Sequence, residues 1–181
     1  MAIDYNSSVD YPDQDVAYMN ILSVDQADAF QDRKTWLIDS GRISQALDEL
    51  TIPSSGKIIE VGIWEGDIYE QLKTYFGADR CLGFDIYDYL NNDDSSVTIG
   101  DFRTIHSDHN QDCAVVFNGA GGWDTNTSSK QAVLDYAYAN LVSGGYYLDS
   151  KFLWDFSSPD MSSYTDFTEV ENEVFKVFVK A

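Results

Sequence analysis

The chain has 181 residues, 44% of them hydrophobic, and its 31 acidic and 11 basic residues give a formal net charge of −20. The length favours a single domain over residues 1–181, which can bury roughly 70% of the surface of the unfolded chain. A charge this negative excludes nucleic acid and anionic membranes as partners, because both are bound through clustered Lys and Arg.

Other features of the chain predict a cytoplasmic protein. No apolar run approaches the length of about 18 residues that a membrane-spanning helix needs, and the first residues lack the pattern of a signal peptide. Cys81 and Cys113 each open an apolar run, so we expect both to be buried and reduced.

The first part of the chain is predicted to differ from the rest. Residues 1–23 are polar and show no period, which indicates a loose N-terminal arm. Residues 24–55 form a helical N-terminal segment, in which Ser40 can cap a helix. One face of that helix would present Ile43, Leu47 and Leu50.

Residues 56–181 alternate apolar runs with helical stretches and are predicted to form the sheet core. The predicted strands are KIIEV (57–61), CLGFD (81–85), SVTI (96–99), CAVVFN (113–118) and YYLDS (146–150), and the predicted helices are 67–76 and 128–141. The last stretch, 167–180, predicts an antiparallel hairpin whose alternating part, 174–180, suits a sheet edge. Continuous apolar runs are typical of strands buried on both faces. The expected fold class is therefore α/β, with a doubly wound, mostly parallel sheet and an antiparallel C-terminal hairpin.

The stretch IIEVGIWEGDIYEQL joins the first strand to the first of these helices through Gly62 and Gly66. The carboxylates of Glu60, Glu65 and Asp67 lie in or beside this turn. At about 6 Å and an effective dielectric of about 20, each would repel a phosphate charge by roughly 2–3 kcal/mol. The turn therefore favours a ligand with local positive charge, such as a sulfonium with an ammonium tail, over a pyrophosphate.

The helix that follows is predicted to begin with a capping box between Asp67 and Glu70. Such a cap would occupy the backbone N–H groups that a pyrophosphate uses at a helix N-terminus. The stripe of this helix that faces the sheet would consist of Ile68, Leu72, Tyr75 and Phe76.

Four segments in order resemble motifs of the class I S-adenosylmethionine-dependent methyltransferases. They are IIEVGIWEG, LGFDIYDYL, IGDFRTI and LVSGGYYLDS, spanning about half of the chain, and they are most similar to the macrocin O-methyltransferase and cephalosporin-hydroxylase-like branch. The resemblance implies a Rossmann-like methyltransferase fold and S-adenosylmethionine as the cofactor. The cofactor-binding residues that it implies are Glu60, Gly62, Trp64, Gly66, Asp85, Ile86, Asp101 and Phe102.

The resemblance also implies roles for these residues. The two glycines would let the backbone approach the methionine half of the cofactor, and Trp64 would shape the turn. Asp85 would accept hydrogen bonds from the ribose hydroxyls, while Asp101 and Phe102 would lie against the adenine. The alternatives are a solvated strand end for Asp85, a loop acid for Asp101 and a core aromatic for Phe102.

The candidate catalytic residues are Asp149, Asn118 and His106. The branch commonly holds a divalent ion with carboxylates at the ends of the fourth and fifth strands. Here Asn118 and Ala120 stand where acids would be expected, and Ser150 follows Asp149, so the sequence predicts no metal site. His106 is a natural general base in the loop after the third strand, although such a polar loop can also be merely solvated.

The prediction is a methyltransferase that uses S-adenosylmethionine to methylate a neutral or cationic small molecule, with O-methyl transfer favoured. The missing acids leave open a catalytically degenerate protein of the same fold that serves as a binding or accessory protein. A nucleotide-dependent oxidoreductase is the third candidate, and the lack of a Gly-x-Gly-x-x-Gly pattern argues against it. The short segment after the fifth strand would leave the acceptor pocket shallow or completed by a second subunit, as in a homo-oligomer.

Overall fold

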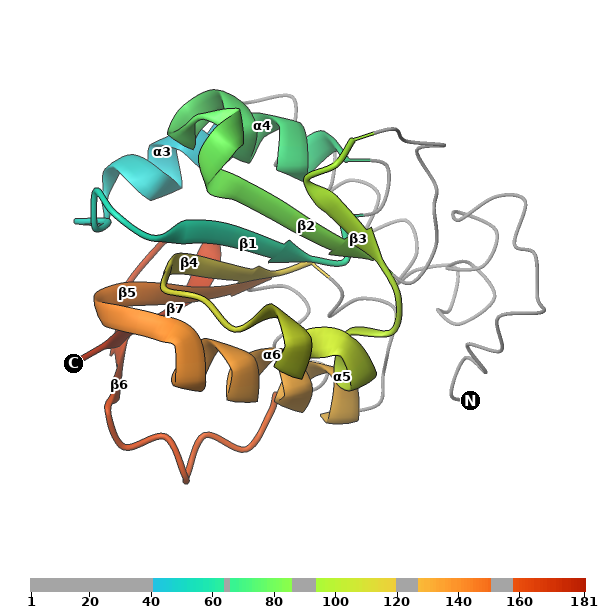
Figure 1. Cartoon of the computed structure of the whole chain (residues 1–181). Coiled ribbons are helices and arrows are strands. Elements are labelled where there is room, and N and C mark those ends of the chain that lie inside the picture. Colours follow the sequence, from blue (N-terminus) through green and yellow to red (C-terminus); the bar gives the residue numbers. More distant parts are fainter. Residues whose placement is uncertain (1–40, 64–65, 86–93, 120–126, 151–157) are drawn as a thin grey trace, which may run out of the picture.

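The computed structural model describes residues 41–63, 66–85, 94–119, 127–150 and 158–181 (Figure 1). The predicted arm and most of the predicted N-terminal helical segment lie outside these ranges. The strands are β1 (Lys57–Val61), β2 (Cys81–Asp85), β3 (Val97–Ile99), β4 (Cys113–Asn118), β5 (Leu141–Ser150), β6 (Phe167–Val170) and β7 (Phe175–Lys180). The helices are α3 (Arg42–Asp48), α4 (Asp67–Phe76), α5 (Phe102–Ile105) and α6 (Thr127–Asn140), with short 3-10 turns at Ala78–Arg80 and His106–His109.

The strands form one seven-stranded sheet in the order β3-β2-β1-β4-β5-β7-β6. The five strands from β3 to β5 pair in parallel, whereas β7 is antiparallel to both β5 and β6. This arrangement confirms the predicted fold class. The alternating run 174–180 does not form an edge, however, because β7 lies between β5 and β6. Its charged residues are accommodated there because Lys176 binds Glu169 and Lys180 donates to the backbone carbonyls of Tyr138 and Leu141.

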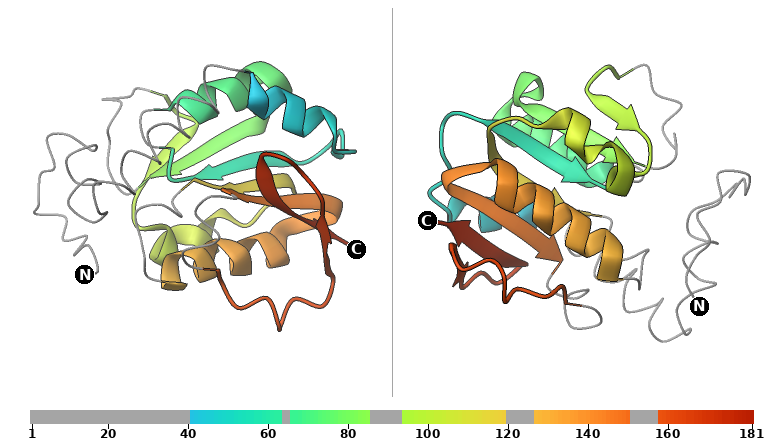
Figure 2. Two further views of the ribbon diagram at one scale, coloured as in Figure 1. Left: turned by 180° about the vertical axis from the view of Figure 1, so that it is seen from behind. Right: turned by 60° about the horizontal axis from the view of Figure 1, so that its bottom comes forward.

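Helices cover both faces of the sheet (Figures 1 and 2). α3 and α4 lie on one face and α5 and α6 on the other, which the right-hand view of Figure 2 brings forward. On the α3 and α4 face, the core includes Ile58, Val115, Leu148, Leu47 and Leu72. On the α5 and α6 face, it includes Ile59, Val116, Tyr147, Leu134 and Phe102. Consecutive residues of one strand, such as Ile58 and Ile59, thus point to opposite faces of the sheet, as strand geometry requires.

α4 begins as predicted at Asp67, but its cap is a glycine. Gly66, with φ of 83°, is the N-cap, and no side chain caps the helix. The predicted capping box does not form. The left-handed Gly66 turns the chain into the helix, and the Gly66 carbonyl accepts a hydrogen bond from the backbone N–H of Glu70 at 2.8 Å. The Glu70 side chain instead binds Lys73 at 2.7 Å.

The buried stripe of α4 also differs in part from the prediction. Its buried residues are Tyr69 and Leu72, and Ile68 and Phe76 pack partly buried beside them. Tyr75 is 39% exposed, and its hydroxyl donates to an Asp48 oxygen of α3. The buried face of α4 is therefore centred on Tyr69 and Leu72, and Tyr75 lies at the edge of this face, next to solvent.

The loop between β6 and β7 is tied to α3 by one buried amide. Asn172 Nδ2 donates to the carbonyl of Ala46 at 3.0 Å, and Asn172 Oδ1 accepts from the backbone N–H groups of Val174 and Phe175. The N-cap of α3 is Gly41, and Ser40, the predicted cap, lies outside the described residues. Of the residues expected on its apolar face, Ile43 and Leu47 are buried, as predicted, and Leu50 lies beyond its end.

Two further observations concern the residues that the structure describes. None of the helices in these ranges is long and apolar enough to cross a membrane. Cys81 and Cys113 are both buried and free, as the sequence predicts.

Candidate functional site

Most of the buried polar side chains among the described residues lie at the carboxyl edge of the parallel strands. Of the described residues, six polar or charged ones are buried, and Asn172 is the only one of the six remote from this edge. The other five are Glu60, Asp85, Asn118, Asp149 and Lys130. From β1, the chain adds β2 and β3 on one side and β4 and β5 on the other, so a topological switch point lies between β1 and β4. Ligands of open α/β sheets bind at such a point.

Glu60 and Asp85 lie on the face covered by α4. Glu60 is in register with Gly83, which comes two residues before Asp85, so the three share one face. A Cβ on Gly83 would lie 3.3 Å from the ring of Tyr69, which identifies that face as the α4 side. The two carboxyl groups therefore end neighbouring strands on the same side of the sheet.

Glu60 is 1% exposed, and this burial raises the pKa of its carboxyl well above the ordinary value. The nearby charge of Asp85, itself 7% exposed, raises the pKa of Glu60 further. Among the described residues, Glu60 Oε2 has no hydrogen-bond partner. A buried carboxyl oxygen without a partner, beside a second carboxylate, attracts either a proton or a cation.

The turn after β1 is held close to the end of β4. Gly62 and Gly66 have φ of 80° and 83°, a conformation that favours glycine. The Gly62 N–H donates to the Phe84 carbonyl at 2.7 Å. A Cβ on Gly119 would lie 2.5 Å from the Gly62 carbonyl oxygen and 3.2 Å from Glu60 Oε1. Position 119 therefore has no room for a side chain, and the two backbones enclose the Glu60 carboxyl.

Asn118 and Asp149 form a second polar group, on the α6 face. The two residues are in register on β4 and β5, and both are fully buried. Asn118 Nδ2 donates to Asp149 Oδ2 at 2.9 Å, and the Tyr147 hydroxyl donates to the same oxygen at 2.9 Å. Burial first, and then the charge of Asp149, raise the pKa of Tyr147 well above its ordinary value. The hydroxyl of Tyr147 is thus a hydrogen-bond donor to Asp149.

Lys130 joins this group from α6, and sequence reasoning missed it. Its side chain is 0% exposed. Burial lowers the pKa of Lys130, while the charge of Asp149 raises it. Helical spacing in the sequence could have indicated that Lys130 is buried. It precedes the buried Val133 and Leu134 by three and four residues, so it lies on the face of α6 that packs on the sheet.

The segment after β3 reaches the same edge beside Asp85, since the Gly100 N–H donates to the Asp85 carbonyl at 2.8 Å. Asp101 caps α5, and its Oδ2 lies 2.6 Å from Arg103 Nη2. This pairing with Arg103 lowers the pKa of Asp101. The structure therefore shows a helix cap and ion pair at Asp101, and an adenine contact there stays a prediction.

Phe102 and His106 pack against each other on the α5 face. Phe102 is 7% exposed and contacts Phe84 edge-to-face, with ring centroids 5.1 Å apart. His106 Nδ1 lies 2.9 Å from the Phe102 carbonyl oxygen. Within the described ranges, His106 has no contact with Asn118 or Asp149. Trp64 and Ile86, which the sequence assigns to the cofactor, lie outside the described residues.

No group of three or more His, Cys, Asp or Glu residues that could hold a metal ion occurs among the residues that the structure describes. At the ends of β4 and β5, the oxygen donors are the amide of Asn118 and the carboxylate of Asp149, and the charge of Asp149 acts on the buried Lys130.

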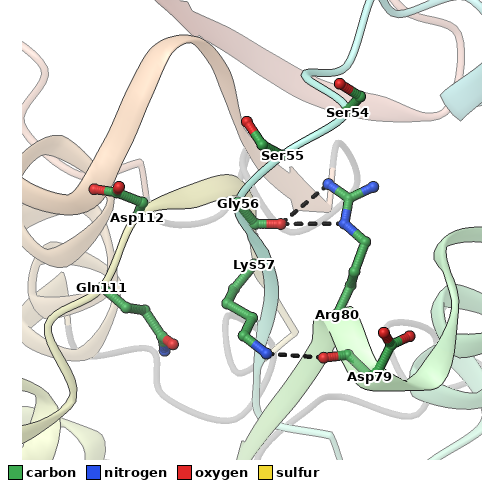
Figure 3. A pocket seen from close by; sticks show the side chains of 8 residues that line it. All are labelled: Ser54, Ser55, Gly56, Lys57, Asp79, Arg80, Gln111 and Asp112. Carbon is green, nitrogen blue, oxygen red and sulfur yellow. Dashed lines mark hydrogen bonds between the residues drawn. The ribbon is translucent and has the colours of Figure 1, made fainter.

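An open depression of about 470 Å³ lies at the opposite edge, at the amino ends of β1 and β2 (Figure 3). It is lined by Ser54, Ser55, Gly56, Lys57, Asp79, Arg80, Gln111 and Asp112. Lys57 Nζ donates to the Asp79 carbonyl at 2.8 Å, and Arg80 donates twice to the Gly56 carbonyl at 3.0 and 3.1 Å. Both cations at this edge thus bind backbone carbonyls of the neighbouring loops.

Comparisons with known proteins bear on the fold of the chain. No protein-family model and no curated protein matches the chain. Among solved structures, a chain in the complex of the Haloferax volcanii Trm112 methyltransferase activator and the putative methyltransferase is similar, with 15% identity and a TM-score of 0.51. That match covers 81% of this chain and 77% of the other. The fold is a Rossmann-like methyltransferase fold.

Streptomyces venezuelae DesVI is also similar, with 16% identity and a TM-score of 0.50. The match covers 70% of this chain but only 56% of DesVI. At these identities the likeness shows the fold, and the macrocin-type branch suggested by the motifs stays a prediction.

Proposed function

We propose that the chain is an S-adenosylmethionine-dependent methyltransferase that acts on a neutral or cationic small molecule, with O-methyl transfer the favoured reaction. The observation that supports this most is the pair of buried carboxyl groups, Glu60 and Asp85, beside the glycine turn. In a methyltransferase-like fold this pair lies where a ligand binds, and it favours a cation over a polyanion.

The residues present fit S-adenosylmethionine. The cofactor supplies a methyl group on a positively charged sulfur. Glu60, whose Oε2 has no partner among the described residues, would hold the positively charged methionine half. Asp85 would accept hydrogen bonds from the ribose hydroxyls, and the glycine turn would let the backbone approach. Asp101 and Phe102, brought beside Asp85 by the Gly100 hydrogen bond, would lie near the adenine.

The same acid pair disfavours a pyrophosphate at this site. The N-cap of α4 is Gly66, which has no side chain. The cap therefore does not keep an anion from the backbone N–H groups at the start of the helix. A dinucleotide would still be repelled by Asp85 and would require Glu60 to stay protonated, since a buried anion is costly unless it is paired.

Asn118 and Asp149 would serve the acceptor at the ends of β4 and β5. Methyl transfer is an in-line displacement, so much of its acceleration comes from holding the two reactants in line. The acceptor hydroxyl would hydrogen-bond to these side chains, and its proton would pass to a base. Asp149 is the first candidate for that base, and His106 is the second.

One observation favours the second candidate function, a binding or accessory protein of the same fold. Asn118 and Asp149 are 1% and 0% exposed and bond to each other, as structural residues do. Such a protein would bind the cofactor and show no transfer across a broad panel of hydroxylated and amine acceptors. Transfer that is abolished in a folded Asp149→Asn variant would contradict it.

Calorimetry with S-adenosylmethionine and S-adenosylhomocysteine tests the proposal. We expect saturable binding by the wild type and affinity about tenfold or more weaker in Glu60→Gln, which loses a charge-assisted hydrogen bond. Asp79→Asn, an exposed acid at the opposite edge, is the matched control and should bind as the wild type does. No heat from either ligand at millimolar concentration would refute the proposal.

A further inference from the structure

Lys130 is the unusual group that the proposed function leaves unused. Among the basic residues that the structure describes, it is the only buried one, and its exposure is 0%. It lies in the first turns of α6, on the stripe that continues into Val133 and Leu134. A cation is unfavourable there for two reasons: burial removes its water, and the N-terminal end of a helix repels positive charge.

Asp149 is the opposite charge that offsets this cost. It is 0% exposed, and its charge acts on Lys130. Its Oδ2 also accepts hydrogen bonds from Asn118 Nδ2 and the Tyr147 hydroxyl, each at 2.9 Å. Two hydrogen bonds to this oxygen and a buried cation nearby favour the ionised form of Asp149 and fix the orientation of its carboxylate.

Among the described residues, the other charged and titratable groups around Asp149 have partners of their own or lie on the other face of the sheet. On β7, its register partner Lys176 binds Glu169 at 2.5 Å. On β5, burial and the Asp149 charge raise the pKa of Tyr147, so this residue stays protonated. The Tyr164 hydroxyl donates to Asp135 of α6 and, with its pKa raised to about 12, carries no charge. On β4 the neighbour is the neutral Asn118 amide, and Glu60 of β1 lies on the other face of the sheet. Lys130 is thus the cation matched to Asp149 from the helix layer.

We propose that Lys130 is a positioning residue for the acceptor half of the site, whose charge keeps Asp149 ionised and in place to receive the acceptor proton. The catalytic step rests on the proposed function, whereas the charge pairing does not. In that step the acceptor oxygen bonds to the methyl carbon, the carbon–sulfur bond breaks with its electron pair going to sulfur, and the hydroxyl proton passes to the Asp149 carboxylate. A weak base suffices, because the hydroxyl becomes strongly acidic as its oxygen bonds to carbon.

The charge pairing is tested first, by thermal unfolding from pH 4.5 to 8 in steps of about half a unit. Lys130→Met should lower the melting temperature at pH 7 by roughly 10 °C, because it leaves a buried carboxylate without its cation. Removing the cation should favour the protonated form of the buried Asp149 carboxyl in the folded variant, so the stability present at low pH should be lost as pH rises. The deficit against the wild type should therefore shrink toward pH 4.5.

Three further variants make this test decisive. Lys130→Met/Asp149→Asn should recover most of the lost melting temperature, because neither charge remains. Lys130→Arg should lie between the wild type and Lys130→Met. Lys73→Met, which removes a partly exposed cation bound to Glu70 and Asp94, should cost only roughly 2 °C. A pH-independent deficit in Lys130→Met, or a double variant no more stable than it, would overturn the pairing.

The positioning role is tested on the same variants at a temperature where all are folded. Lys130→Met should bind S-adenosylhomocysteine within about twofold of the wild type, yet lose at least tenfold in turnover at pH 7 and regain part of it as pH rises and Asp149 ionises. Lys130→Arg should retain turnover. Unchanged turnover in Lys130→Met would overturn the role. A wild type that binds no cofactor would instead refute the proposed function and leave the unfolding test valid.

Discussion

Glu60 and Asp85 end neighbouring parallel strands on the same face of the sheet, and the charge of Asp85 raises the pKa of Glu60 beyond what burial alone does. Glu60 also has an oxygen without a hydrogen-bond partner among the described residues. The protonation of Glu60 therefore depends on Asp85, and on the proposed function we expect it to change when a cationic ligand binds.

The first prediction concerns stability against pH. The folded pKa of Glu60 lies above its unfolded value of about 4.3, so the stability that it contributes is fully present at low pH and is lost as pH rises through the folded pKa. Glu60→Gln does not titrate. The free energy of unfolding of the wild type, measured in urea, should therefore fall relative to this variant between pH 5 and pH 8. Parallel curves for the two proteins would show that Glu60 folds ionised.

The second prediction concerns protons released on binding. A cation placed against Glu60 favours its ionised form, so S-adenosylmethionine should expel a proton when it binds near pH 6.5. Calorimetry in phosphate and in Tris should then give different binding enthalpies, because the two buffers take up the proton with different heats. In Glu60→Gln the difference should vanish. Equal enthalpies for the wild type would place the ligand away from this carboxyl.

A third prediction tests the close approach of the β1 and β4 ends. Gly119→Ala would place a Cβ 2.5 Å from the Gly62 carbonyl oxygen, so the turn must shift. We expect a loss of roughly 1–3 kcal/mol in stability and at least tenfold in cofactor affinity. Gly144→Ala is the control: its Cβ meets nothing within 4 Å, and its φ of 78° alone should cost about 1 kcal/mol without changing affinity. Equal affinities in the two variants would mean that the turn is not part of the site.

The fourth prediction concerns the anchor of the C-terminal hairpin. Asn172→Ala removes the buried amide that bridges Ala46 to the start of β7 and leaves its backbone partners unsatisfied. The free energy of unfolding in urea should fall by about 3 kcal/mol. Asn110→Ala, which removes one exposed hydrogen bond to Ser107, should change it by no more than about 0.5 kcal/mol. A small effect at position 172 would show that α3 holds the hairpin by apolar packing.

Much of the sheet could be predicted because its central strands are buried on both faces. β1, β2 and β4 begin and end where their apolar runs do. The position of β7 within the sheet could not be predicted. The alternation of apolar and polar residues shows only that one face of the strand is covered, and it does not show whether the strand has one neighbour or two. Lys176 and Lys180 read as edge residues, yet they find partners on Glu169 and on backbone carbonyls within the sheet.

The sequence predicted those residues of the candidate site that lie at the carboxyl ends of strands. Glu60, Asp85, Asn118 and Asp149 meet at one edge because parallel strands end there together. Lys130 could not be found in this way, because a lysine on a helix is ordinarily solvated and only its spacing to Val133 indicates otherwise. The Gly66 cap was missed because Asp67 is itself a favoured cap residue, and the left-handed conformation of the glycine decided between them.

A crystal structure with S-adenosylhomocysteine bound is the most direct test of the account. It should show the ribose hydroxyls on the Asp85 carboxylate, the methionine half over the turn from Gly62 to Gly66, and the amino group near Glu60. A ligand bound at the opposite edge beside Lys57 and Arg80, or an Asp85 side chain directed away from the ribose, would contradict it.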